Sequence, residues 1–421
     1  MSASPSRPTT PSSSHGNPLA TLVHEQLLPP LPRPDAWGIA AELQGIAACY
    51  VAAGVATSFE ELMVVTGTAF RAHVFSIKLN PGLRLRPDPE QPNAMWSARY
   101  LWSSLQHNNY GHTEATAYYL GGEVRDAVGM DVLEFWKVVR FEVDAGRPLV
   151  LYGGRAAHRA DLIVGYRLER DPMRQVIYLQ GDGEVIPLEL PAPTLQVSKG
   201  APAARVIADG AITLPRPESD RPQRPPMPGE QLFLVRPGPL QAYRSSDAER
   251  IRDVLRWAVE HGHHRKELIY ETSRFYATGL QAFEAWASFL TEGIEEELAS
   301  PTSDADDPVA DLALHTAITA QEWSRARRVA ATWLRAHAGE ALPTAVTRPT
   351  ADAYDRVADA LEYVRGIFAP VDDAPEAARA AVRSRELRAH AATKIRKAAE
   401  AEHEALALLT AGLTDAPETG G

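Results

Sequence analysis

The chain has 421 residues, 45% of them hydrophobic, which is enough for two domains that each bury a core. Its formal net charge is -11 and the acidic residues are spread along the sequence, which excludes the basic surface of a nucleic-acid-binding protein. The single cysteine, Cys49, excludes an internal disulfide framework and a thiolate metal cluster. We expect a protein of the reducing cytoplasm that has no metal and no cofactor.

The N-terminal residues, 1–34, form a leader and connector rich in Pro, Ser and Thr. They lack the apolar core of a signal peptide, and no stretch of the chain approaches the roughly 20 apolar residues that span a bilayer. We therefore expect a disordered leader and no contact with a membrane. The high usage of Ala, Arg and Pro favours a bacterial source.

The next part of the chain, 35–240, mixes helical and strand patterns and predicts one α+β domain. The capping box Ser58-Phe59-Glu60-Glu61 predicts a helix that ends at Thr66-Gly67. The Pro-dense stretch 187–239 predicts an edge of this domain followed by a tether. The other expected elements are helices at 19–28, 37–53 and 130–144 and strands at 149–152, 160–166, 175–179 and 230–235.

From Ser246 onward the sequence is helical in pattern, and a second capping box, Ser246-Asp247-Ala248-Glu249, opens it. We expect an all-α bundle of about five helices at 246–413, an acidic disordered loop at 300–307, and a disordered tail at 414–421. The expected helices are 248–260, 266–297, 308–338, 350–368 and 375–413.

Several short motifs carry a family resemblance. They are ELM (61–63), TGTAFR (66–71), DAGRPLV (144–150), IVGY (163–166), GLQAFEAW (279–286) and EAEHEA (400–405). On these motifs the chain resembles bacterial proteins whose N-terminal domain is like that of butirosin biosynthesis protein H, a branch of the C39 and papain-like group. The resemblance implies a papain-like (C39-like) core followed by a helical bundle. It also implies cysteine-dependent acyl or amide chemistry in specialised metabolism, with an acyl group on a carrier protein as substrate.

The position of Cys49 departs from that pattern. A papain-type cysteine begins the central helix, where the helix dipole and a histidine lower its pKa. That position falls at Ala40 or Ala41, whereas Cys49 lies about two turns further along an Ala-rich helix. Two interpretations stay open: Cys49 is a small buried core residue, or it is the nucleophile of a helix that begins later than expected.

The histidine of the papain pattern is also displaced. Counted back from Gly165, its position falls on Arg159, and His158 is one step away on the opposite face unless a bulge restores it. Asp161 shares a face with Arg159. Asp182 follows the next strand, where a third triad member comes, although a turn aspartate explains it equally well. The candidate catalytic residues are therefore Cys49, His158 and Asp182, and Arg159 and Asp161 are candidate substrate-binding residues.

Two further residues, Arg71 and His73, are candidates for substrate binding. An arginine at a buried edge needs a carboxylate or phosphate partner, and Asp161 and Glu142 are candidate internal partners of Arg71. His73 belongs with the polar patch 107–112 to a group of residues that we expect to line a pocket.

The histidines near the end of the first bundle helix are explained by capping. His261, His263 and His264 lie where cations interact favourably with the helix dipole.

The sequence supports two functions from different classes. The first is a pseudoenzyme with a degraded triad that binds a small molecule, a carrier-bound acyl group or a protein partner. The second is a cysteine-dependent acyltransferase or amide hydrolase that uses Cys49 and His158. A thiol at a helix N-terminus beside an imidazole would favour the enzyme, and a thiol buried in mid-helix would favour the pseudoenzyme. The sequence does not indicate an oligomeric state.

Overall fold

The structure is a computed structural model, which places an antiparallel sheet beside a bundle of helices. The described residues are 24–29, 31, 41–75, 116–117, 119–127, 132–152, 160–168, 175–181, 185–190, 231–238, 247–269, 274–294, 308–368 and 375–415. The expected leader before residue 24, residues 191–230 of the Pro-dense stretch, the loop at 300–307 and the tail after residue 415 lie outside this part. No described helix is both long enough and apolar enough to cross a membrane.

The main sheet is antiparallel throughout its described strands. Its order is β3 (Glu123–Ala127), β8 (Gln231–Arg236), β4 (Leu149–Tyr152), β5 (Ala160–Leu168), β6 (Gln175–Gln180) and β7 (Val185–Leu190), with β1 (His24–Leu27) paired to the second half of β5. The four strands predicted from the sequence are therefore confirmed, and the expected helix at 19–28 is replaced in its described part by β1.

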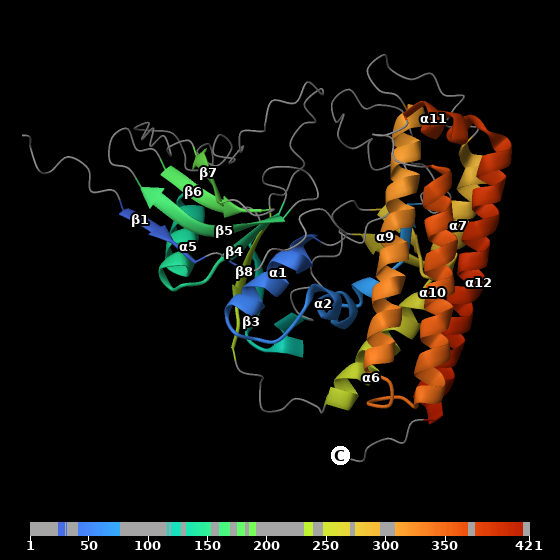
Figure 1. The fold of residues 1–421 in the computed structure, drawn as a ribbon, viewed down its shortest axis with the longest axis horizontal. Helices are drawn as coiled ribbons and strands as arrows, with labels where there is room; N and C mark the ends of the chain where they lie inside the picture. Colours follow the sequence, from blue (N-terminus) through green and yellow to red (C-terminus); the bar gives the residue numbers. More distant parts are fainter. Residues whose placement is uncertain are drawn as a thin grey trace, which may run out of the picture.

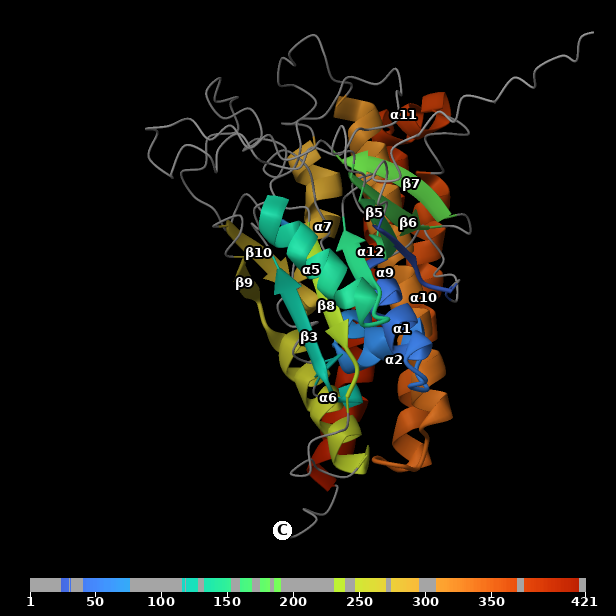
Figure 2. The same ribbon diagram turned by 90° about the vertical axis from the view of Figure 1, so that its left-hand side faces the viewer.

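Helices cover both faces of this sheet. Helix α1 (Ala41–Ala52) packs on β4, and a Cβ added at Gly45 would lie 2.6 Å from Val150 Cγ1, so the helix backbone comes close to the strand there. Helix α5 (Val132–Asp144) covers the other face, where Tyr166 Oη donates to Asp144 Oδ1 at 2.6 Å. Figure 2 shows α5 in front of the strands and α1 behind them.

The predicted helix start is confirmed, because Ser58 caps α2 (Phe59–Val65) and the Glu61 amide donates to Ser58 Oγ at 3.1 Å. The helix ends before Gly67, whose φ of +75° is in the left-handed region that favours glycine. A 3₁₀ turn, Thr68–Phe70, follows and leads into β2 (His73–Phe75).

Strand β2 belongs to a second sheet that joins distant parts of the sequence. It pairs with β10 (Arg274–Thr278), which also pairs with β9 (Lys266–Ile269). The expectation of a helix over 266–297 is therefore wrong for its first part. Strands β9 and β10 are antiparallel, and β10 completes its hydrogen bonds with a strand from the first half of the protein.

The bundle consists of α6 (Asp247–His263), α7 (Leu280–Ser288), α9 (Pro308–Ala336), α10 (Thr344–Ile367), α11 (Pro375–Arg383) and α12 (Arg385–Asp415). A π-helical turn, Phe289–Gly293, continues α7. The centre of the bundle contains Trp286 and Trp323. Both side chains are fully buried, and their ring centroids are 5.3 Å apart in an edge-to-face arrangement. The helix expected at 375–413 is divided into α11 and α12 at Ser384. The Ser384 Oγ accepts a hydrogen bond from the Leu387 amide and so caps the start of α12.

The sheet half and the bundle share one continuous core. Figure 1 shows α1 and α2 between the strands and helix α9. At this junction Arg327 of α9 donates to the carbonyl oxygens of Ala69, Phe70 and Arg71, at 2.9, 3.2 and 3.1 Å. These bonds satisfy the carbonyl groups that the 3₁₀ turn leaves without partners at its end.

Candidate functional site

Helix α1 runs in the same direction as β5. Gly45 lies against Val150, and one turn later the Cys49 thiol donates to the Pro148 carbonyl oxygen at 3.8 Å, so the helix runs antiparallel to β4. Since β4 and β5 are antiparallel, the start of α1 and the start of β5 lie at the same end of the sheet. The last residue of β6, Gln180, pairs with Leu162 near that end.

Three of the predicted site residues lie outside the described residues. They are His158 and Arg159, just before β5 begins, and Asp182, just after β6 ends. The described groups at this end include Glu42 in the first turn of α1 and Gln180. The Gln180 side chain holds Leu31 by two hydrogen bonds, one from the Leu31 amide at 3.2 Å and one to its carbonyl oxygen at 3.0 Å.

A bulge interrupts β5 at Val164. Leu162 and Ile163 pair with Gln180 and Leu179, but the next pair joins Gly165 to Tyr178, which leaves Val164 as the extra residue. Gly165 and Leu162 therefore lie on the same face, the one that α1 covers. The alternation of side chains between the two faces therefore shifts by one residue at this point. A bulge of this kind is what the sequence analysis required if position 158 and Gly165 are to share a face.

Cys49 lies in mid-helix and not at the start of α1. It is 2% exposed, and burial raises the pKa of its thiol well above the usual range. Pro148, which accepts its hydrogen bond, precedes β4, whereas the start of β5 pairs with the far end of that strand at Tyr152. Those two points are separated by about 13 Å of extended chain, so the thiol has the surroundings of a core residue.

Two buried carboxyl groups, one on α1 and one on α9, interact electrostatically. Glu42 is fully buried in the first turn of α1, and Glu322 is 9% exposed on α9. Burial, with a smaller contribution from the charge of Glu42, raises the pKa of Glu322 to about 8. Glu322 therefore carries a proton at neutral pH, and we call Glu42 and Glu322 the carboxyl pair.

The predicted partners of Arg71 are placed differently from the expectation. Glu142 lies on α5, where Arg236 and Arg147 bind it, the former at 2.6 Å. Burial alone would raise the pKa of Glu142, but the hydrogen bonds and charges of these two arginines outweigh it and lower that pKa. Asp161 is buried and alternates with Leu162, so it lies on the sheet face opposite α1. Arg71 belongs instead to the junction with the bundle.

Arg71 and His73 take part in a column of stacked side chains at that junction. The Arg71 guanidinium lies 5.1 Å from the ring centroid of Trp257, which stacks on His261 with centroids 4.9 Å apart. His261 stacks in turn on His73, and their Nε2 atoms are 3.2 Å apart. We call these four residues the histidine stack. It joins the 3₁₀ turn and β2 to helix α6.

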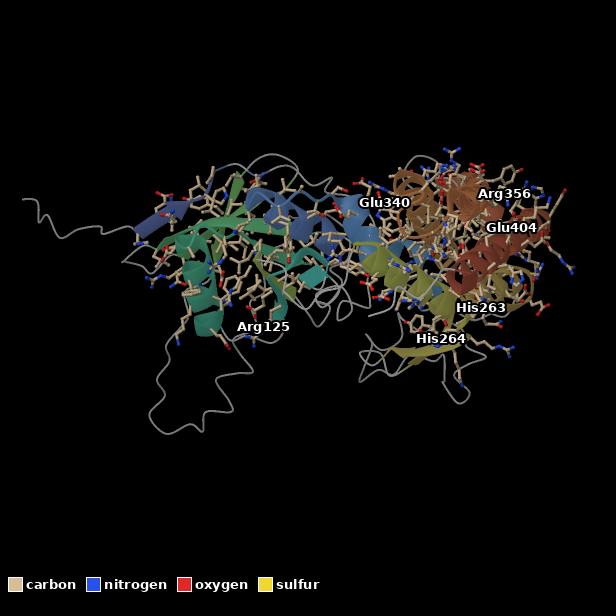
Figure 3. The ribbon with its side chains drawn as sticks, turned by 90° about the horizontal axis from the view of Figure 1, so that it is seen from below. Arg125, His263, His264, Glu340, Arg356 and Glu404 are labelled. Carbon is tan, nitrogen blue, oxygen red and sulfur yellow. The ribbon has the colours of Figure 1, made fainter. Side chains whose placement is uncertain are left out.

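The structure corrects the interpretation of the helix-end histidines. His261 is 6% exposed and its ring lies inside the histidine stack, whereas His263 and His264 are exposed. Figure 3 labels the latter two near the end of α6. Burial lowers the pKa of His261 well below its usual range, and the charges of His73 and Arg71 add to this effect. A neutral, buried His261 does not cap the helix as a cation.

The sequence reasoning missed Glu42, Glu322 and Trp257, and it gave His261 a different role. The pair of Glu42 and Glu322 and the pair of His73 and His261 each join segments far apart in the chain, which local spacing does not indicate; His73 and His261 are 188 residues apart. Trp257 and His261 are four residues apart on α6, so their spacing was the one local signal for a contact. The patch at 107–112, expected beside His73, lies outside the described residues. Within the described part no group of three or more His, Cys, Asp or Glu side chains is arranged to hold a metal ion.

No known family model matches this chain, and no curated protein matches it.

Proposed function

We propose that this protein is a papain-like-fold protein of bacterial specialised metabolism whose cysteine chemistry has been lost and which binds a ligand or a protein partner. The observation that carries the proposal is the position of Cys49. Its thiol is buried, its pKa is raised, and it lies at the wrong end of β4 for a contact with the start of β5. A reactive cysteine needs the opposite surroundings, an exposed helix N-terminus that lowers its pKa.

The papain-like part of the proposal rests on the direction of the elements. Helix α1 covers one sheet face and runs parallel to β5, so its first turn, the start of β5 and the end of β6 meet at one end. This arrangement suits a site made of a helix N-terminus and two strand ends. Helix α9 brings Glu322 to the same region, where the carboxyl pair supplies one protonated group at neutral pH.

The proposed ligand is a small molecule or an acyl group presented on a carrier protein, bound at the start of α1. A helix N-terminus favours anions and polar oxygen atoms through its exposed N–H groups. A protonated Glu322 is able to donate a hydrogen bond to such an oxygen, in the manner of any neutral carboxyl group.

The test uses the native full-length chain and an acyl thioester of N-acetylcysteamine as probe. We expect intact-mass spectrometry to find no acyl adduct, and iodoacetamide to label Cys49 slowly in the native protein and quickly after unfolding in urea. The Cys49→Ala variant provides the control, and we expect it to fold and to keep the probe-induced shift in melting temperature shown by the wild type.

Two results would contradict the proposal. Stoichiometric acylation of native Cys49, absent from Cys49→Ala, would establish the cysteine-dependent acyltransferase or hydrolase instead. A melting temperature that no acyl thioester changes, in the wild type or in Cys49→Ala, would remove the acyl ligand from the proposal.

A further inference from the structure

The contact between His73 and His261 depends on the number of protons that the two rings hold. Their Nε2 atoms are 3.2 Å apart, a hydrogen-bonding distance, and both side chains are buried. In such a pair one ring donates its N–H and the other accepts with its lone pair. If both rings are protonated, two N–H groups face each other and the bond is replaced by repulsion between like charges.

The groups around His261 disfavour a positive charge. The histidine stack places Arg71 on the far side of Trp257, and Arg327 approaches from α9 with its guanidinium held by Glu402 of α12. The charge of His264, which follows the last residue of α6, disfavours a charge on His261 as well. A proton added to the buried pair therefore enters a place where the neighbouring charges are mostly positive and where water is excluded.

The other elements packed against the pair keep their acidic groups at the surface. Helix α2 packs on α6, and its Glu60 is exposed while Glu61 accepts a hydrogen bond from Thr57. Helix α7 packs on β2, and its Glu284 pairs with Arg396 on the exposed side of the bundle. Strand β10 pairs Thr278, a neutral residue, with His73.

We infer that the pair of His73 and His261 is a proton-sensitive contact, which holds helix α6 against strand β2 in neutral solution and loosens this junction when the medium is acidified. The contact lies between segments 188 residues apart, at the point where the sheet half meets the bundle. Acidification therefore weakens the junction itself, and the change in the rest of the bundle is smaller.

The sign of the effect follows from proton linkage. Burial lowers the pKa of His261, so the opened form takes up a proton that the closed form does not hold. The contact is fully stable above the usual imidazole pKa of about 6.5. Below that value each proton taken up on opening shifts the closed-to-open ratio about tenfold per pH unit.

Hydrogen–deuterium exchange followed by mass spectrometry tests this inference on the full-length protein between pH 7.5 and 5.5. After correction for the intrinsic exchange rate, we expect the protection of the α6 peptides to fall about tenfold per pH unit below pH 6.5. The α10 peptides serve as an internal reference, and we expect their protection to change less.

The variants separate this contact from other groups that titrate. In His261→Gln the fall in α6 protection is expected to disappear, whereas His263→Gln, an exposed neighbour on the same helix, is expected to keep it. Glu322 is present in both proteins, so its effect cancels when the α6 protection of the variant is subtracted from that of the wild type. Because its pKa is raised, Glu322 stabilises the folded protein on acidification, opposite to the effect of the histidine pair.

Three outcomes would overturn the inference. They are wild-type α6 protection that does not change with pH, an unchanged pH dependence in His261→Gln, and an equal loss of protection in α10. The first and third need only the wild-type protein, so the inference is tested even if His261→Gln does not fold.

Discussion

Arg327 and Glu402 form a buried ion pair that links two helices of the bundle to the sheet half of the protein. The Arg327 Nε and Nη2 atoms lie 2.8 and 2.9 Å from the two carboxylate oxygens of Glu402, and both side chains are almost fully inaccessible. The same guanidinium donates to the carbonyl oxygens of the 3₁₀ turn, including that of Ala69. The arginine thus satisfies a carboxylate on one side and the end of a backbone turn on the other.

The first prediction removes the charge of Glu402. Glu402→Gln leaves the buried guanidinium without its counter-ion, so we expect a loss of about 3 kcal/mol in the free energy of unfolding measured in urea. The matched control is Glu404→Gln, two residues further along α12, because Glu404 pairs with Arg356 in an exposed ion pair. Figure 3 labels Glu404 and Arg356. We expect less than about 1 kcal/mol for the control, and equal losses in the two variants would contradict a special role for the buried pair.

The second prediction concerns Glu322. Its pKa is raised to about 8, so between the usual glutamate pKa, near 4.3, and pH 8 the folded protein keeps a proton that the unfolded chain releases. Stability is therefore lost as the pH rises through this range. Glu322→Gln removes the ionisation, and we expect it to raise the free energy of unfolding by about 1–3 kcal/mol at pH 7.5, with the gain disappearing toward pH 4.5.

Urea unfolding at a series of pH values measures this effect. Glu340→Gln is the control, because Glu340 is an exposed residue near the end of α9. A gain in Glu322→Gln that is independent of pH would show that proton linkage is not its cause.

The third prediction separates backbone strain from side-chain contact at two glycines. Gly67 and Gly54 both have positive φ, of +75° and +80°. A Cβ at Gly67 would lie 2.3 Å from Trp257 Cζ3, whereas a Cβ at Gly54 would meet nothing within 4 Å. We expect Gly54→Ala to cost about 1–2 kcal/mol from backbone strain alone.

Gly67→Ala is expected to add about 1–3 kcal/mol to that loss, because the new methyl group displaces Trp257 from the histidine stack. Thermal melts of the two variants under the same conditions measure the difference. Similar melting temperatures would mean that the tryptophan moves away without strain.

The fourth prediction concerns Arg71, whose guanidinium lies over the Trp257 ring in a buried setting. We expect Arg71→Ala to lower the free energy of unfolding by about 2 kcal/mol, the upper part of the range for a desolvated cation–π contact. Arg325→Ala is the control, because Arg325 lies 5.8 Å from the Phe59 ring centroid in a half-buried position. Calorimetric melts compare the two, and an unchanged melting temperature with weakened ligand binding would place Arg71 in a binding site instead.

The sequence by itself determined the elements whose signals are local. The capping box at Ser58, the apolar run Leu149–Tyr152 and the helical spacing around Trp286 each predicted an element that the structure contains. These signals work because a cap, a strand face and an amphipathic helix are formed by residues close together in the chain. The α+β character of the first half and the helical character of the second follow from them.

Only the tertiary structure decided which distant groups meet. The segment around Arg274–Thr278 reads as part of a helix, yet it forms a strand because His73–Phe75 offers it a partner. His261 reads as a helix cap, yet it is buried because His73 and Trp257 cover its ring. Hydrophobic periodicity predicts which face of an element is buried but not which other element covers it. Contacts between residues nearly two hundred positions apart therefore cannot be predicted from the local sequence.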